Sequence, residues 1–291
     1  MKKMQPPASD EIEDKTISIR AFAQSPSGKP KRPRKQSAPR KPPRASEWVV
    51  IFDTETTTDP GQRLRFGTYQ VRERDRLHEA GLFYDPSALT AKELHLLSTY
   101  AEKNDLKLLV HQEFVDSVFY RYGYWLGGTI VGFNLPFDIS RIAIGHSSAR
   151  KTSAKKNIKR RQTTDNNSYL NLMRNGFSFK LSTDKRNPRI QVRHLSRKAS
   201  IIRFAAPFRS QDARSTRKRN DGTSVRRGFF VDANTFSTAQ FAQSFTLQSL
   251  ADFLEVEKRK LSTDEHGGPI TREYVEYAVR DVQTTWNAIR S

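Results

Sequence analysis

The residues best suited to chemistry in this chain are four acids, which lie in three short motifs. In chain order these motifs are Asp53-Thr54-Glu55, Asn134-Leu-Pro-Phe-Asp138 and Tyr277-Ala-Val-Arg-Asp281. The chain has no cysteine, so disulfides and thiolate zinc sites are excluded, and its six histidines show no paired spacing. Any metal site is therefore expected to use oxygen ligands, which suit Mg²⁺ or Mn²⁺.

The first motif follows a predicted buried strand. WVVIFD is a continuous apolar run of strand length, rich in β-branched residues, and it ends in the polar turn TETTTDPG. Side chains alternate along a strand, so Asp53 and Glu55 project from the same side and can share a cation. Acids also end strands simply by facing water, so this motif alone does not identify a site.

The second motif lies where a predicted strand turns into a helix. GGTIVGFN has the pattern of a short strand, and LPFDISRIAI is expected to begin a helix with Pro136 near its start, where a missing N–H costs nothing. Asp138 then lies in the first helical turn. An acid there can also serve only to complement the helix dipole.

The third motif lies on the last predicted helix, which runs from Thr271 as N-cap to Ile289. Tyr277 and Asp281 are one turn apart and share a face. The stripe expected to face the core consists of Val275, Ala278, Val279, Val282, Trp286 and Ile289. Tyr277 and Asp281 could be only a boundary pair whose acid faces water. The conjunction of all three motifs, in order, favours a common site.

The elements around these motifs predict an α/β fold, with a mixed sheet flanked by helices. LRFGTYQVRER and LHEAGLFYD alternate in part and extend the first strand into an antiparallel meander. Apolar residues at helical spacing then predict two helices, through Leu94, Leu97 and Tyr100, and through Phe114, Val118, Phe119, Tyr122 and Trp125. FFVDANTF restores a strand pattern, with Asp232 interpreted as a structural cap of the helix after it, and TLQSLADFLEV predicts an amphipathic helix.

The net charge of +20 is unevenly distributed. Residues 1–45, rich in Pro, Lys, Arg and Ser, carry 12 Lys and Arg against 4 Asp and Glu, and we expect a disordered basic arm. We expect one domain over residues 46–291, with a basic insertion at about 146–228 that carries 23 Lys and Arg against 4 Asp and Glu. The runs FSFKLS, RIQVRHL and SIIRFAA predict an inserted β subdomain there.

A basic insertion beside clustered acids suits a nucleic-acid substrate. Lys and Arg contacts to phosphates supply most affinity that does not depend on base sequence. The candidate phosphate contacts in the insertion are Lys155, Lys156, Lys159, Arg160 and Arg161. Phe133 and Phe137 are candidates to stack on terminal bases, although such aromatic residues are more often part of a core. A charge run can likewise be only a solvated face.

The sequence predicts an intracellular protein, cytoplasmic or nucleoid-associated, with no membrane partner. The mean hydropathy is -0.74, and no window is apolar enough or long enough to span a bilayer. The start, MKKMQPPASDEIED, lacks the apolar region of a secretory signal, and its acids do not fit a transit peptide.

The three motifs together resemble the DEDD superfamily of 3′-to-5′ exonucleases, in the subclass with Tyr four residues before the last Asp (DEDDy). The resemblance covers roughly residues 48–145 and 229–291. FFVDANTFSTAQFAQSFTLQSLADFLEVEKRKL, leading into YVEYAVRDVQTTW, looks most like the exonuclease part of family B DNA polymerases. The basic insertion departs from that pattern. The resemblance implies an RNase H-like fold for this chain.

The resemblance also implies how the site works. Asp53, Glu55, Asp138 and Asp281 would hold two divalent cations, Mg²⁺ or Mn²⁺, and Asn134 would lie near the 3′ end of the bound strand. Tyr277 would orient the attacking water, because tyrosine is a poor base at neutral pH. The expected activity is hydrolysis of the terminal phosphodiester of DNA or RNA, releasing nucleoside 5′-monophosphates.

Two other interpretations remain open on the sequence. One is the proofreading part of a longer family B polymerase, and the other is a catalytically silent module that binds nucleic acid. The expected partner is nucleic acid with a free 3′ end, single-stranded DNA being favoured, and replication or repair partners are not identified by the sequence.

Overall fold

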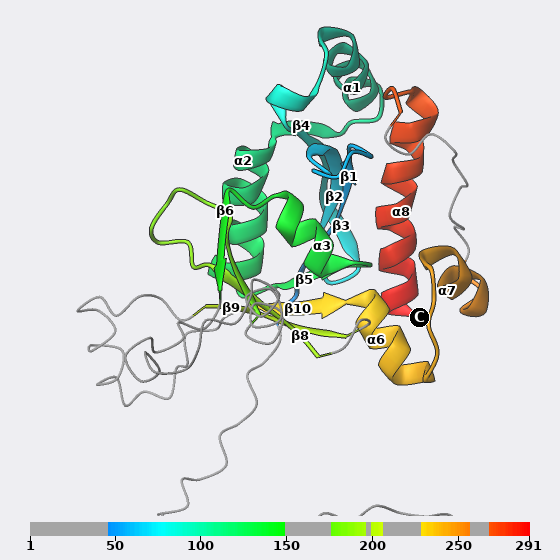
Figure 1. The fold of residues 1–291 in the computed structure, drawn as a ribbon. Coiled ribbons are helices and arrows are strands. Elements are labelled where there is room, and N and C mark those ends of the chain that lie inside the picture. Colours follow the sequence, from blue (N-terminus) through cyan, green and yellow to red (C-terminus); the bar gives the residue numbers. More distant parts are fainter. Residues whose placement is uncertain (1–45, 149–175, 196–198, 206–227, 257–267) are drawn as a thin grey trace, which may run out of the picture. The chain divides into compact units, whose positions relative to one another are not determined.

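Two β-sheets carry the described part of the chain, which comprises residues 46–148, 176–195, 199–205, 228–256 and 268–291 of this computed structural model. The described residues all belong to the unit Pro43–Ser291. One sheet has six strands in the order β10-β5-β1-β2-β3-β4, and the other has four in the order β6-β7-β8-β9. Helices lie on both faces of the six-stranded sheet (Figure 1). The protein is therefore α/β with a mixed sheet flanked by helices, as predicted.

The predicted antiparallel meander forms the middle of the six-stranded sheet. It consists of β1 (Trp48–Thr56), β2 (Leu64–Glu73) and β3 (Arg76–Tyr84). On one side, β5 (Thr129–Gly132) runs parallel to β1, and β10 (Phe229–Asp232) runs parallel to β5. The carboxyl ends of β1, β5 and β10 therefore meet at the same end of the sheet, which is where ligands commonly bind in such sheets.

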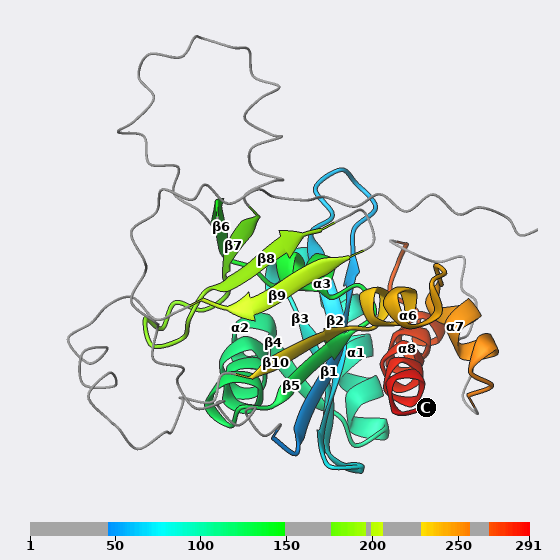
Figure 2. The same ribbon diagram turned by 90° about the horizontal axis from the view of Figure 1, so that it is seen from below.

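Two short strands were not predicted from the sequence. β4 (Lys107–Val110) pairs parallel with β3 after helix α1 (Ala91–Lys103), whose N-terminus has a capping box between Thr90 and Glu93. β6 (Gly145–Ser148) is the first strand of the second sheet, before the three predicted strands β7 (Phe177–Lys180), β8 (Ile190–His194) and β9 (Ser200–Phe204). The second sheet is antiparallel throughout. Figure 2 shows its strands beside α2 and β10.

One face of the six-stranded sheet packs on α2 (His111–Phe114), which continues directly into the π-helix η2 (Val115–Trp125). Val50 and Phe52 of β1 contribute to this core together with residues of the second sheet such as Phe204. The ring of Phe204 lies 4.7 Å from that of Phe230 on β10, so the two sheets share one core. The helix predicted through Phe114 and Trp125 is present, and Trp125 at its end is 57% exposed.

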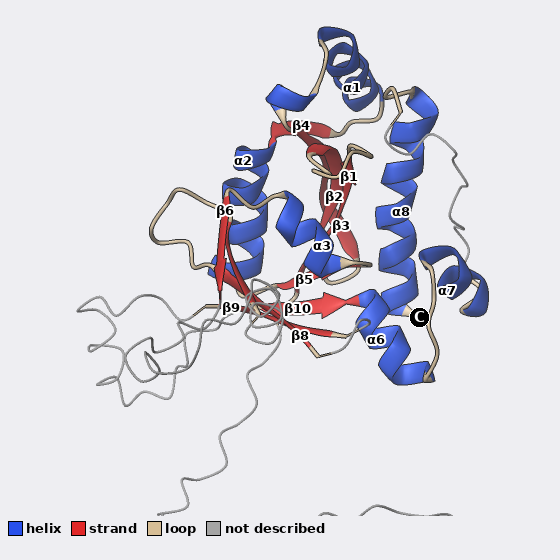
Figure 3. Cartoon of the chain, in the orientation of Figure 1, coloured by secondary structure: helices blue, strands red, loops and turns tan. Residues whose placement is uncertain are grey.

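The opposite face of the sheet packs on α8 (Arg272–Arg290) (Figures 1 and 3). Its N-cap is Thr271, as predicted, and Ile51 and Val131 of the sheet pack against Val282 and Trp286 of the helix. Of the predicted stripe, Val275, Ala278, Val282 and Trp286 are buried, whereas Val279 and Ile289 are half-buried.

Polar contacts hold α8 against the sheet at both ends. Before its first turn, the backbone N–H of Ile270 donates to Glu93, and Arg65 of β2 forms an ion pair with Glu93 and donates to the carbonyl of Gly268. Near its last turn, the guanidinium of Arg72 lies 4.9 Å from the ring centre of Trp286 and donates to Gln283. The helix is thereby fixed in register along β2.

The remaining helices are short. A 3₁₀ turn, η1 (Pro86–Ala88), follows β3, and α3 (Leu135–Arg141) follows β5, ending earlier than the predicted run LPFDISRIAI. α6 (Ala233–Phe241) begins directly after β10, so only the first half of FFVDANTF is strand. α7 (Leu247–Phe253) forms where TLQSLADFLEV predicted it. Among the helices that the structure describes, none has the length and apolar composition needed to span a membrane.

Candidate active site

Asp53 and Glu55 lie at the carboxyl end of β1 on the face that α8 covers. Ile51 packs on α8, and alternation along the strand puts the side chains of Asp53 and Glu55 on that same face. Asp53 is half-buried and Glu55 is buried. Gly67 of β2 pairs with Thr54 between them, and a Cβ at Gly67 would lie only 2.5 Å from the carbonyl oxygen of Asp53, so a glycine is needed for this close pairing.

Asp138 reaches the same strand end from the first turn of α3. Its Oδ1 accepts a hydrogen bond of 2.7 Å from Thr54, which alternation places on the other face of β1. Asp138 is 1% exposed, and its buried Oδ2 accepts no hydrogen bond from any residue that the structure describes. A Cβ at Gly132, the last residue of β5, would lie 3.5 Å from this Oδ2. The carboxylate therefore lies between the ends of β1 and β5.

Tyr277 and Asp281 are presented by the sheet-facing side of α8. Tyr277 is 2% exposed and Asp281 is 5% exposed, so the alternative of a boundary pair with a solvated acid is wrong. The Tyr277 side chain is hydrogen-bonded to that of Asp281 one turn later. Thr68 of β2 donates a 2.9 Å hydrogen bond to the carbonyl oxygen of Ala278, which ties this stretch of α8 to the strand opposite Asp53.

The charges of these acids act on one another across the three elements. Burial raises the pKa of Asp138 well above its ordinary value, and the negative charge of Asp53 raises it further. Smaller contributions in the same direction come from Asp232 and Glu55, while the hydrogen bond from Thr54 lowers the pKa. Burial also raises the pKa of Tyr277, followed by the charge and hydrogen bond of Asp281 and the charges of Glu55 and Asp53. Asp53 and Glu55 thus act on both Asp138 and Tyr277.

The donor set suits hard divalent cations. Its ligands would all be carboxylate oxygens, and the buried Oδ2 of Asp138 lies in a negative environment that a cation would offset. Within the described ranges, no three acidic or imidazole side chains are already arranged to hold an ion. Two of the four acids already accept a hydrogen bond from the protein, Glu55 from Tyr274 and Asp138 from Thr54. The residues therefore fit the expected group in the type of their donor atoms.

Asp232 joins two of the elements that form the site. As expected, it caps the following helix, since its Oδ2 accepts from the backbone N–H of Thr235. Its Oδ1 also accepts a 2.9 Å hydrogen bond from the N–H of Leu135, the first residue of α3. Burial raises the pKa of this carboxyl group, against the opposing effect of these hydrogen bonds. Asp232 therefore fixes the start of the helix that carries Asp138.

No protein-family model and no curated protein matches this chain. The assignment of residues therefore depends on the sequence motifs and on the geometry described above.

The predicted nucleic-acid contacts are only partly described. Asn134 is exposed just before α3, beside the half-buried Phe133 and Phe137. The Phe137 ring lies 4.8 Å from the guanidinium carbon of Arg141, so one face is already covered by a cation. Lys155, Lys156, Lys159, Arg160 and Arg161 lie outside the described residues.

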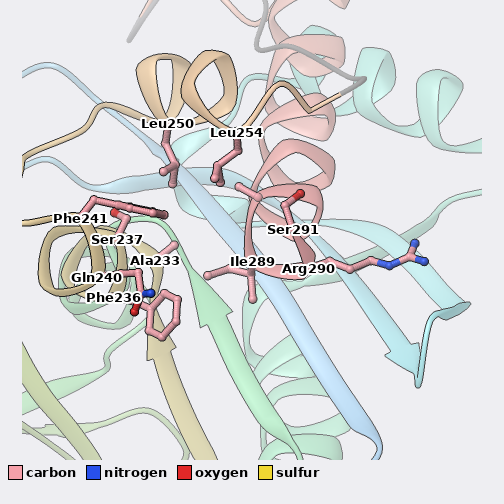
Figure 4. A pocket seen from close by; sticks show the side chains of 11 residues that line it. Ala233, Phe236, Ser237, Gln240, Phe241, Leu250, Leu254, Ile289, Arg290 and Ser291 are labelled. Carbon is pink, nitrogen blue, oxygen red and sulfur yellow. The ribbon is translucent and has the colours of Figure 1, made fainter.

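A cavity of about 340 Å³ lies between α6, α7 and the last turn of α8 (Figure 4). Apolar side chains such as Phe241, Leu250 and Ile289 line it, and Figure 4 shows Arg290 extending away from it. None of the predicted site residues is among its lining residues. This cavity is therefore separate from the carboxylates.

The sequence interpretation missed two residues of the site, Thr54 and Tyr274. Tyr274 donates a 2.7 Å hydrogen bond to Oε2 of Glu55. The signal for Tyr274 was its helical spacing, because residues 274, 277, 278 and 281 lie on one face of a helix. Thr54 gave no comparable signal, since alternation turns it away from Asp53 and Glu55.

Proposed function

We propose that this protein is a metal-dependent 3′-to-5′ exonuclease with an RNase H-like fold, related to the DEDDy exonucleases and to the exonuclease part of family B DNA polymerases. One observation carries the proposal. The end of β1 is joined by buried hydrogen bonds to both helices that carry the other acids, because Thr54 donates to Asp138 of α3 and Tyr274 of α8 donates to Glu55. Besides burial, the charges of Asp53 and Glu55 also raise the pKa of both Asp138 and Tyr277. Buried like charges cost stability, and perturbed carboxyl groups of this kind cluster at functional sites.

The proposed cofactors are two divalent cations, Mg²⁺ or Mn²⁺, held by Asp53, Glu55, Asp138 and Asp281. When bound, such cations acidify the attacking water and offset the charge on the phosphate and the departing 3′ oxygen. The acids lie on β1, α3 and α8, and β1 runs parallel to β5, which in turn runs parallel to β10. These elements hold their side chains in place before substrate arrives.

Tyr277 orients the water in this proposal. Its pKa is raised by burial and by Asp281, so the phenol keeps its proton throughout the neutral range. A protonated phenol cannot act as general base, but its hydroxyl can donate or accept a hydrogen bond at a fixed position. The bond to Asp281 holds that hydroxyl beside a proposed cation ligand.

The proposed substrate is single-stranded DNA with a free 3′ end. The test is degradation of 3′-labelled and 5′-labelled DNA and RNA strands of the same sequence, with Mg²⁺, Mn²⁺ or EDTA. We expect stepwise loss from the 3′ end, release of nucleoside 5′-monophosphates, and no reaction in EDTA. RNA degraded in preference to DNA would reassign the substrate.

Two substitutions test the assignment of the acids. Asp53→Ala and Asp281→Ala should each abolish hydrolysis while the fold and DNA binding persist. Asp184→Ala, which removes only the half-buried partner of the exposed Arg186, is the matched control and should keep full activity. Full activity in either site variant would end the two-metal proposal. Binding of DNA by a wild-type protein that never hydrolyses it would favour the catalytically silent module instead.

A further inference from the structure

A second tyrosine of α8 contacts the proposed site. The hydroxyl of Tyr274 donates a 2.7 Å hydrogen bond to Oε2 of Glu55. Tyr274 is 1% exposed and Glu55 is 8% exposed, so the bond is shielded from water. A hydrogen bond in such a buried, low-dielectric place is electrostatically stronger than one in water. The carboxylate of Glu55 is therefore held in one orientation.

The ring of Tyr274 is itself fixed by its neighbours. Phe66, which pairs with Glu55 across β1 and β2, contacts the ring edge-to-face at 5.4 Å between centres. The backbone N–H of Tyr274 donates to Oγ1 of Thr271, the N-cap of α8. The hydroxyl thus has a set position before any ligand binds.

The start of α8 is also tied to the rest of the fold. Glu93 of α1 accepts from the N–H of Ile270 and forms an ion pair with Arg65 of β2, and both of these charged groups are largely buried. This network anchors the segment immediately before Tyr274 to β2 and α1. A displacement of Tyr274 away from Glu55 would have to break it.

We infer that Tyr274 is a positioning residue that orients Glu55 as a cation ligand, so that the two tyrosines of α8 have different partners and different roles. This inference rests on the proposed function. The hydroxyl of Tyr274 donates a hydrogen bond to Oε2 of Glu55, whereas Tyr277 contacts Asp281. Without the Tyr274 hydroxyl, Glu55 can rotate, and cation affinity falls. Groups that orient metal ligands in this way typically contribute about 10-fold to 100-fold in affinity for the metal.

The test is Mn²⁺ binding to the full chain without nucleic acid, measured by electron paramagnetic resonance, beside the Mg²⁺ dependence of hydrolysis. We expect Tyr274→Phe to raise the Mn²⁺ dissociation constant by about tenfold and to raise the Mg²⁺ concentration for half-maximal rate in parallel. The Michaelis constant for DNA at saturating Mg²⁺ should hardly change. The ring, and with it the packing on Phe66, is retained in this variant.

Tyr69→Phe is the matched control. Tyr69 is buried on β2 and donates a 2.8 Å hydrogen bond to Glu79, but it belongs to the core on the opposite face of the sheet. The Tyr69→Phe variant should lose about as much free energy of unfolding as Tyr274→Phe does, and it should bind Mn²⁺ with wild-type affinity. Phe66→Leu keeps the Tyr274 hydroxyl but removes the ring that packs on that tyrosine, so the Mn²⁺ dissociation constant should rise by a smaller factor. This variant provides the test if Tyr274→Phe does not fold.

The outcomes separate this inference from the proposed function. If the wild-type protein binds Mn²⁺ and hydrolyses DNA, and Tyr274→Phe binds Mn²⁺ equally well, the positioning role is overturned and the exonuclease stands. If Mn²⁺ binding weakens in Tyr274→Phe but the wild-type protein hydrolyses no nucleic acid, the positioning role stands and the exonuclease fails.

Discussion

The hydroxyl of Thr54 donates a 2.7 Å hydrogen bond to Oδ1 of Asp138, although the two residues are 84 positions apart in the chain. This bond connects β1 to the first turn of α3 and is buried at both ends. It fixes one oxygen of the carboxylate and directs the other, Oδ2, toward the end of β5 at Gly132. Thr54 therefore sets how Asp138 enters the site.

Replacement of Thr54 tests this relationship. Thr54→Val keeps the shape but removes the donor, so a buried carboxylate oxygen loses its partner at a cost of about 1–3 kcal/mol in the free energy of unfolding. Hydrolysis should also slow, since Asp138 is no longer oriented. Urea denaturation and turnover measure the two effects. Thr54→Ser retains the hydroxyl and should keep most of both, and wild-type turnover in Thr54→Val would refute the role.

The raised pKa of Asp138 predicts a pH dependence of stability in the metal-free protein. The folded state binds this proton at pH values where the unfolded state, with an ordinary value of 3.8, has lost it. The contribution of Asp138 to stability is therefore fully present below that value and is lost as the pH rises through the folded-state pKa. Asp138→Asn should remove this slope and be more stable than wild type at pH 8 in EDTA.

Urea denaturation at several pH values in EDTA checks the Asp138→Asn prediction. Asp184→Asn is the control, because hydrogen bonds from Arg186 lower the pKa of Asp184 and its loss should give no gain at high pH. A pH slope in Asp138→Asn equal to that of wild type would assign the effect to another group.

Asp232→Ala tests the double cap. Two part-buried N–H groups, of Leu135 and Thr235, lose their acceptor, and a loss of about 1–3 kcal/mol in the free energy of unfolding is expected. Turnover should fall as well, because α3 carries Asp138. Thr246→Ala is the matched control, because Thr246 caps only α7. Its loss should lower the free energy of unfolding by about 1 kcal/mol without changing turnover. Equal effects of both variants on turnover would contradict a special role for Asp232.

Tyr277→Phe should lower the turnover rate with little change in the Michaelis constant, because only the hydroxyl that contacts Asp281 is lost. Steady-state kinetics at saturating Mg²⁺ measure both quantities. Tyr120→Phe serves as control. It removes another buried hydroxyl, which donates a 2.6 Å hydrogen bond to the carbonyl oxygen of Pro188. An unchanged turnover rate in Tyr277→Phe would reassign the residue to packing.

The basic insertion gives a prediction of a different kind. Neutralising Lys155, Lys156, Lys159, Arg160 and Arg161 should weaken DNA binding and flatten its dependence on log salt, by roughly 0.7 to 0.9 in slope for each phosphate that is no longer neutralised. The turnover rate at saturating substrate should hardly move. Fluorescence anisotropy at several salt concentrations measures the slope.

A matched control neutralises five charges of the amino-terminal arm, Lys29, Lys31, Arg32, Arg34 and Lys35. If the insertion contacts substrate, this control should change the slope less than the insertion variant does. Unchanged affinity and slope in the insertion variant would exclude the contact. Thermal destabilisation without a binding defect would indicate instead that the insertion docks on the acidic part of the chain.

Local patterns predicted those parts of the fold that depend on local periodicity. Alternation gave the meander, and the N-cap Thr271 with its apolar stripe gave α8, because a long helix packed on a sheet shows its buried face directly in the sequence. Asp232 was predicted as a cap for the same reason, since N-capping is a local interaction.

The errors occur where a distant partner or an irregular backbone decides the outcome. β4 and β6 have four residues each, too few for a period to be visible, and form only because β3 and β7 pair with them. The helix predicted through Phe114 and Trp125 is present, but spacing did not reveal that most of it is a π-helix, which shifts the angular position of each later residue and leaves Trp125 exposed. The partner of Tyr274 lies 219 positions away, and no local pattern could reveal it.

The anchoring of α8 at both ends has a consequence for its length. Arg65 and Glu93 hold the segment before its first turn, and Arg72 holds Trp286 near its last. One residue added or removed between Tyr274 and Asp281 would rotate the two parts of the helix relative to each other by about 100°. Tyr274 and Trp286 could then no longer both face the sheet. The segment from Tyr274 to Asp281 can therefore change by substitution, whereas an insertion or deletion in it would turn one end of the helix away from the sheet.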